Sequence, residues 1–161
     1  MEGLFNNTIL GEKFSELKQQ RSNQLWFDSI SDEKVKEFIL FLVQYGQLFS
    51  KGINEFGQVI GLYSELTEQI DPTKKHNTPY TFHDTGEFFK SMFVTPLSEG
   101  FIIDGDGIKT GKKLRNGEAV DSTIDLFKEY GDEIIGLTEE SKEELAVFLV
   151  DKFIENVKKI L

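Results

Sequence analysis

Residues 84–104 read DTGEFFKSMFVTPLSEGFIID, and this stretch decides the fold class because it predicts a short helix that leads directly into a β-hairpin. Asp84 and Glu87 have the spacing of a capping box, in which Asp84 is the N-cap and Glu87 lies three residues into the helix. The helix then places Phe88, Phe89 and Met92 on its inward side. We therefore expect this turn of helix to pack on the core.

The hairpin is predicted from two apolar runs, Met92–Leu97 and Phe101–Asp104, on either side of residues 98–100. Apolar runs of this length, separated by a short glycine-containing turn, are typical of antiparallel strands. A further hairpin or loop region is expected between Gly105 and Gly117, where glycine recurs and basic residues gather. The middle of the chain is thus predicted to form a small antiparallel sheet.

Helices are expected on the N-terminal side of this sheet. Apolar residues recur at helical spacing in residues 9–21, and residues 26–30 form an apolar connector. Ser31 is the predicted N-cap of a second helix that continues to about residue 50. Apolar residues lie on several sides of this helix, Phe41 and Leu48 among them, so it must be covered on several sides. Either it is the central core helix, or a partner subunit covers part of it.

The C-terminal third is predicted to be helical as well. Ser122–Tyr130 is read as a helix that Gly131 ends, and Thr138 as the N-cap of a long final helix.

Between residues 52 and 70 we expect a loop, a short strand and one helical turn, followed by an exposed loop or arm at 71–80. The fold class is α+β: one domain spanning 1–161, with a small antiparallel β-sheet flanked by amphipathic helices. The apolar stripe of the final helix consists of Leu145, Phe148, Leu149, Phe153, Val157 and Leu161.

The composition excludes several classes of protein. The net charge of −10 disfavours sequence-specific nucleic-acid binding, which requires a basic face. An acidic surface suits a channel through which DNA slides without sticking, or it serves only solubility. The chain has no cysteine, so it forms no disulfide and offers no thiolate. No secretion signal is evident at residues 1–7 and no apolar run approaches roughly 18 residues, so we expect no membrane partner.

Three motifs suggest chemistry, and each is a poor match to the pattern it needs. His83 and Asp84 precede Ser91, but sequence neighbours point apart and Ser91 lacks the glycine-flanked elbow of a nucleophile. The run from Asp104 to Gly107 has only two of the acids of a calcium loop. Residues 107–113 are one residue short between glycines for a phosphate loop. We expect no catalytic residue, no cofactor and no metal.

One longer stretch, TPYTFHDTGEFFKSM at 78–92, resembles the tail-completion or virion-morphogenesis proteins of tailed bacteriophages. Those proteins carry an aspartate or similar residue, Thr-Gly, a large apolar residue and a serine before a strand. The run that opens their C-terminal helix is similar to GLTEE at 136–140. This chain lacks the histidine and the Arg-Pro pair that many relatives carry near Gly131. The residues of this structural motif are Asp84, Thr85, Gly86, Glu87, Phe88, Ser91, Gly136, Leu137 and Thr138, of which Glu87 belongs to the capping box.

The resemblance implies a structural virion protein, assembled in the host bacterial cytoplasm, that joins head to tail or completes the tail in an oligomeric ring. Its partners would be copies of itself and other phage neck, portal or tail proteins. Two alternatives stay open: a non-viral protein-binding adaptor module and, less favoured, a small hydrolase built on His83. The residues expected at the interface are Phe41, Leu48, Lys74, Lys75, His76, Tyr80, Lys109, Lys112 and Arg115.

Overall fold

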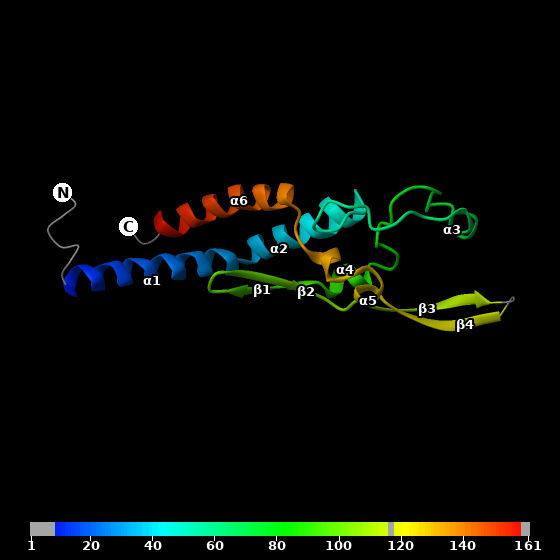
Figure 1. Ribbon diagram of the computed structural model, residues 1–161, viewed down its shortest axis with the longest axis horizontal. Coiled ribbons are helices and arrows are strands. Elements are labelled where there is room, and N and C mark those ends of the chain that lie inside the picture. Colours follow the sequence, from blue (N-terminus) through cyan, green and yellow to red (C-terminus); the bar gives the residue numbers. More distant parts are fainter. Residues whose placement is uncertain (1–8, 116–117, 159–161) are drawn as a thin grey trace.

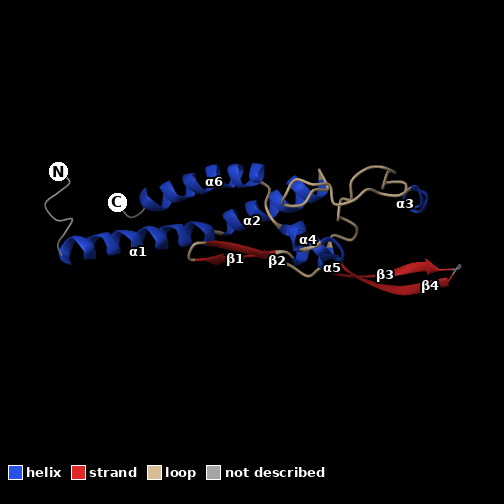
Figure 2. Ribbon diagram, viewed as in Figure 1, coloured by secondary structure: helices blue, strands red, loops and turns tan. Residues whose placement is uncertain are grey.

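The computed structural model describes residues 9–115 and 118–158, apart from the side chains of residues 9–17, 20, 112–115 and 118–121. The described chain is elongated (Figure 1). Helices α1 (Ile9–Ser31) and α6 (Glu139–Lys158) lie side by side at one end. The hairpin of β3 (Ile108–Arg115) and β4 (Glu118–Asp125) projects at the other. The predicted α+β class is confirmed, but the strands form two separate two-stranded antiparallel sheets (Figure 2).

Helix α1 is longer than predicted, because the expected apolar connector at 26–30 is helical. Packing against α6 supports this extension. The rings of Trp26 and Phe153 stack with centroids 4.7 Å apart, and Asn156 Nδ2 donates to the fully buried Ser29 Oγ at 3.0 Å. The predicted apolar stripe on α6 buries Leu145 and half-buries its next four members, while Leu161 lies outside the described residues.

The second helix begins one residue later than predicted. Asp32, not Ser31, is the N-cap of α2 (Glu33–Phe41), and its carboxylate accepts from the Lys34 N–H at 2.9 Å. The chain then continues as a π-helix, η1 (Leu42–Phe49), whose hydrogen bonds join residues five apart. In an α-helix, residues five apart lie about 140° apart around the axis. In η1 the wider turns bring Leu42 and Gln47, and Val43 and Leu48, to the same buried side.

The predicted first hairpin is present, with β1 beginning one residue later and β2 one residue earlier than expected. Strands β1 (Phe93–Leu97) and β2 (Gly100–Asp104) pair antiparallel about the turn at 98–99, with Thr95 opposite Ile102. Helix α4 (Glu87–Ser91) precedes them and buries its apolar side chains as expected. Its capping differs from the prediction. The N-cap is Gly86, at φ 76°, which has no side chain to cap with, and the carboxylate of Asp84 binds Lys74 and Lys109.

The sequence predicts a helix over residues 122–130, and this prediction is wrong for its first four residues. Residues 122–125 belong to β4, where they pair with residues 108–111 of β3, and helix α5 covers only Leu126–Tyr130. Gly131, at φ 84°, ends this helix as expected. The next turn, η2 (Asp132–Ile135), leads to α6, whose N-cap is Thr138: its Oγ1 accepts from the Ser141 N–H at 3.2 Å.

The core lies where α2, η1, α4, β1 and the start of α6 meet. Residues 50–64 run over one end of it, and Ser64 caps the predicted helical turn, α3 (Glu65–Ile70). No helix among the described residues has both the length and the apolar composition needed to cross a membrane. The buried apolar residues that pack together as this core are Val35, Ile39, Leu42, Val43, Leu48, Phe88, Phe89, Met92, Val94, Leu126, Ile134, Ile135, Leu137 and Leu145.

Candidate functional site

A cleft of about 280 Å³ opens where residues 71–80, hereafter the arm, approach α4 and the base of the β3–β4 hairpin. Its lining unites two groups of residues that the sequence predicted separately. Three residues expected at an interface, Lys74, Tyr80 and Lys109, face the motif residues 84–88 across the cleft. The arm and residues 84–88 are neighbours in the sequence, but residues from 106–109 and 124–130 also line the cleft, so the cleft exists only in the folded protein.

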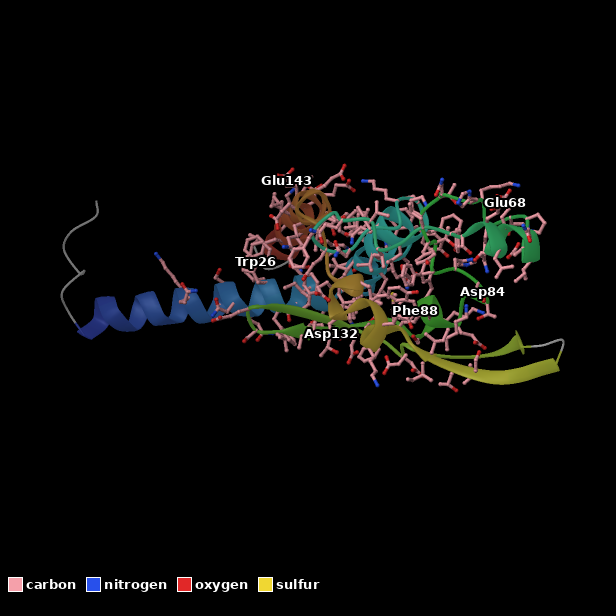
Figure 3. All side chains as sticks on the ribbon, turned by 45° about the vertical axis from the view of Figure 1, so that its right-hand side comes forward. Trp26, Glu68, Asp84, Phe88, Asp132 and Glu143 are labelled. Atoms are coloured by element: carbon pink, nitrogen blue, oxygen red, sulfur yellow. The ribbon has the colours of Figure 1, made fainter. Side chains whose placement is uncertain are left out.

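Asp84 connects the three segments of the cleft. Its Oδ1 lies 3.1 Å from Nζ of Lys74 on the arm, and its Oδ2 contacts Nζ of Lys109 on β3. Lys74 also pairs with Asp71 at 3.3 Å. Figure 3 places Asp84 between α3 and the hairpin, with Phe88 deeper in the molecule. One carboxylate thus ties the arm to the hairpin, and the ion pairs remain open to solvent.

These contacts shift the acid–base properties of the groups involved. Hydrogen bonds from Lys109 and Lys74 outweigh partial burial and hold the pKa of the Asp84 carboxyl below its ordinary value of 3.8. Burial opposes the positive charge of Lys74, but the hydrogen bonds and charges of Asp84 and Asp71 prevail and raise its pKa. Both groups are therefore charged at neutral pH, as an ionic link requires.

Backbone pairing fixes the position of the arm. The N–H of Tyr80 donates to the carbonyl of Gly61 and the N–H of Tyr63 to that of Thr78, each at 2.9 Å. A Cβ on Gly61 would lie 2.3 Å from the Tyr80 ring, so glycine permits this close approach. The remaining predicted arm residues turn towards α3, because Glu68 accepts from Lys75 Nζ at 2.9 Å and from the His76 N–H at 2.8 Å. Lys75 and His76 accordingly do not line the cleft.

Aromatic rings form one wall of the cleft. Tyr80 lies edge-on to Tyr63 at 5.0 Å and to Tyr130 at 6.0 Å, and Phe82 lies 5.4 Å from Tyr130. Phe82 has φ 52°, an outlier for a bulky residue that packing must hold in place. Burial, followed by the charge of Glu129 and the neighbouring tyrosines, raises the pKa of Tyr130. The wall is apolar with phenolic edges, a composition suited to a partner's side chains.

His83, Asp84 and Ser91, the residues of the less favoured hydrolase alternative, each contact other partners. His83 packs edge-on between Phe49 and Phe89 at 5.4 and 5.3 Å, while the Asp84 carboxylate binds lysines. Ser91 Oγ donates to the Phe88 carbonyl at 2.7 Å and accepts from the Asp106 N–H at 2.9 Å. Among the described residues, no cluster of three or more histidine, aspartate or glutamate side chains has the geometry of a metal site.

A second surface feature lies along α2 and η1. Phe41, Tyr45 and Phe49, hereafter the aromatic ridge, follow one another with ring centroids 5.8 and 6.1 Å apart. Their exposed fractions are 54, 44 and 46%. Phe41 was predicted at an interface and is exposed. Leu48 was predicted there too, but it is fully buried, because the π-helical turns direct it into the core.

The other predicted residues lie away from the cleft. Lys112 and Arg115 belong to the outer half of β3, where side chains are outside the described part of the chain. Residues 136–138 form the connection into α6. The side chain of Gln47 makes hydrogen bonds to the backbone of Gly136 and Thr138. This buried polar residue was not identified from the sequence, because it lies within an apolar run. Tyr63, Phe82 and Tyr130 were also missed, since only folding brings them together.

Comparisons of this chain with protein-family models, with curated proteins and with solved structures find no match. Functional inference therefore rests on the cleft, on the aromatic ridge and on the resemblance of residues 78–92 and 136–140. Each of these involves surface or turn residues, from which binding is inferred more directly than reaction chemistry.

Proposed function

We propose that this chain is a structural virion protein of a tailed phage, a head–tail connector or tail-completion subunit that acts as one member of an oligomeric ring. The proposal places it in the phage neck or at the end of the tail, after assembly in the host cytoplasm. Its partners would be copies of itself and the adjoining neck, portal or tail proteins. No enzymatic step is part of this role.

The observation that carries the proposal is the aromatic ridge. Three neighbouring aromatic side chains on one helical face each expose between 44 and 54% of their surface, although the core lies directly beneath them. Contiguous exposed apolar surface marks protein–protein contact sites, and aromatic residues are enriched at such sites. Burying these rings against a partner would remove their apolar surface from water and so stabilise the complex.

The shape of the subunit supports a ring. The β3–β4 hairpin projects from one end and the α1–α6 pair from the other, so the two ends offer different surfaces (Figure 1). A ring of identical subunits needs heterologous contacts, in which one surface meets a different surface of the next copy. The ion pairs of Asp84 join the arm to the hairpin base, so both lie together at one of these ends.

The acidic composition supports a particular use of the ring. At a net charge of −10, a ring interior of this protein would repel the DNA backbone and let the genome pass. A ring that presented a basic interior would bind DNA by counterion release and retain it.

The test is the oligomeric state of the full chain, measured by analytical ultracentrifugation across a concentration series and by electron microscopy. We expect closed rings, and we expect Phe41→Ser and Tyr45→Ser to shift the population towards monomer with an unchanged circular dichroism spectrum. Glu37→Ser, an exposed change on the same helix, is the matched control and should assemble like the wild type.

A protein that stays monomeric at every concentration, alone and mixed with phage portal and tail proteins, would contradict the proposal. The adaptor alternative predicts a different result from the same ridge. In that case the ridge variants lose binding to a cellular protein, and the flanking genes encode no capsid, portal or tail components.

A further inference from the structure

A second hollow of about 700 Å³ lies between β2 and α6, and none of its lining residues belongs to the arm. Strand β2 contributes four consecutive residues, 101–104, to its lining. Because successive side chains of a strand point to opposite faces, a hollow on one face would touch only every second residue. Contact with four in a row indicates a groove that follows the edge of the strand.

That edge has no partner strand. β2 pairs with β1 alone, and no other strand of the described residues borders it. An edge strand presents unpaired backbone N–H and C=O groups, which form a template for a further strand. Natural proteins protect such edges with charge, proline or a covering element. Here most of the residues beside the edge are apolar, which favours the binding of a further strand at this edge.

The walls of the groove suit apolar side chains. Leu145 and Leu149 of α6 line one side, and Ile135 and Leu137 line the floor. Ile102 of β2 is 52% exposed beside them. The charged groups of the lining are Asp104, Asp132 and Lys142, so the acidic groups outnumber the basic one.

Strand β3 of the hairpin carries the complementary charge. Four of its eight residues, IKTGKKLR, are basic and none is acidic, whereas its partner strand β4, EAVDSTID, carries three acidic residues. The two strands of the hairpin pair with each other, and its base contacts the body at α5 and through the ion pair between Lys109 and Asp84. A two-stranded ribbon is marginally stable in water unless a further strand or a helix supports it. In Figure 1 it points away from β1 and β2, so its outer half does not lie over its own groove.

We propose that β3 of a second copy adds to the free edge of β2 as a third strand, with the basic strand meeting the acidic end of the groove. Backbone hydrogen bonds supply the affinity in this mode of recognition, and the side-chain pockets supply the specificity. The groove and the hairpin are different surfaces of one subunit, so the contact is heterologous and continues from copy to copy. This inference rests on the proposed ring and names its subunit contact.

Cross-linking between two single-cysteine proteins tests the contact, because the natural chain has no cysteine. Ile102→Cys lies in the groove and Thr110→Cys lies on β3, and both positions are exposed. Mixed and treated with a short bis-maleimide, the two proteins should yield a 102–110 link that peptide mass spectrometry identifies. Val147→Cys, exposed on α6 outside the groove, replaces Ile102→Cys in the control and should give at least tenfold less product.

A charge substitution gives a second readout. Ile102→Lys places a positive charge against the basic strand and should weaken self-association at least tenfold, whereas Ile102→Asp should weaken it less. The order of the two variants depends on the sign of the charge, which a general loss of apolar contact would not produce.

The outcomes separate this inference from the proposed function. Rings that form without a 102–110 link overturn the β2–β3 contact and leave the ring proposal intact. Failure to self-associate under all conditions overturns both. A link from position 102 to another protein of the particle, in place of a second copy, identifies a different occupant and also overturns the contact.

Discussion

Gln47 and Thr138 are joined through a buried amide: Gln47 Oε1 accepts a hydrogen bond from the backbone N–H of Thr138 at 2.9 Å. The Nε2 of the same side chain donates to the carbonyl of Gly136 at 2.8 Å. Gln47 is 1% exposed, so these two bonds satisfy its amide in the core. Thr138 in turn caps α6. One side chain of the π-helix thus fixes the point where the last helix starts.

Gln47→Ala should lower the free energy of unfolding by about 2–4 kcal/mol, because it leaves a backbone donor and a backbone acceptor without partners in the core. Urea unfolding followed by circular dichroism measures the change. Gln58→Ala, at an exposed position, is the control and should alter stability by less than about 0.5 kcal/mol. Equal losses for the two variants would show that the Gln47 amide does not hold α6.

The local signals in the sequence were sufficient for the first hairpin, for α3 and for the N-cap of α6. Each of these depends on residues within a few positions of one another: the glycine-containing turn before Phe101, Ser64 before α3 and Thr138 before α6. Residues 122–125 were predicted incorrectly because their conformation depends on pairing with residues 108–111 of β3, which lie well before them in the sequence. Asp125 pairs with Ile108, for example, and the hydrogen bonds of the strand pair outweigh the local helical preference.

The apolar helix after Asp32 shows a different limit of sequence reading. Read with α-helical periodicity, Val43 and Leu48 lie on different sides and suggest that several faces need cover. The π-helical turns place Val43 and Leu48 on the same buried side. Among the large apolar side chains of α2 and η1, only those of the aromatic ridge are exposed. Nothing local in the sequence distinguishes a π-helix, which is rare and depends on its packing.

The cleft was predicted in its parts but not as a site. Asp84 has the local pattern of an N-cap, and the competing interaction comes from Lys74 and Lys109, ten and twenty-five residues away. Charged partners at such separations cannot be assigned before the fold is known. Tyr80 was expected at an interface, but its neighbours in the aromatic wall were not foreseen.

Gly61→Ala should displace the Tyr80 ring, because the added Cβ would lie 2.3 Å from its Cε2 atom. We expect a loss of about 1–3 kcal/mol in the free energy of unfolding and a weaker near-ultraviolet circular dichroism signal from the tyrosine cluster. Gly100→Ala is the matched control, since a Cβ there meets nothing within 4 Å. An intact tyrosine signal in Gly61→Ala would mean that the arm does not need this close approach.

Phe153→Ala should red-shift the fluorescence of Trp26, the single tryptophan of the chain, by removing the ring that stacks on it. The loss of an aromatic pair and of its buried surface should cost about 1–3 kcal/mol. Ile154→Ala, at the adjacent exposed position, should leave the emission maximum unchanged. If both variants leave the spectrum unchanged, α6 does not pack on α1 in solution.

Asp84→Asn should reveal the ionic link through its pH dependence. The folded state holds the pKa of Asp84 below 3.8, so the link stabilises the protein above that pH and its contribution is lost as the pH falls through the lower folded value. At neutral pH the wild type should exceed Asp84→Asn by roughly 1 kcal/mol at most, because the ion pairs are exposed and screened. The gap should narrow in high salt, and it should close as the pH falls below 3.8 through the lower folded pKa of Asp84. Asp151→Asn, at an exposed position on α6, should show no such pH-dependent gap. A difference that persists undiminished in acid would assign the effect of Asp84→Asn to packing, and the arm would then be held by its backbone pairing alone.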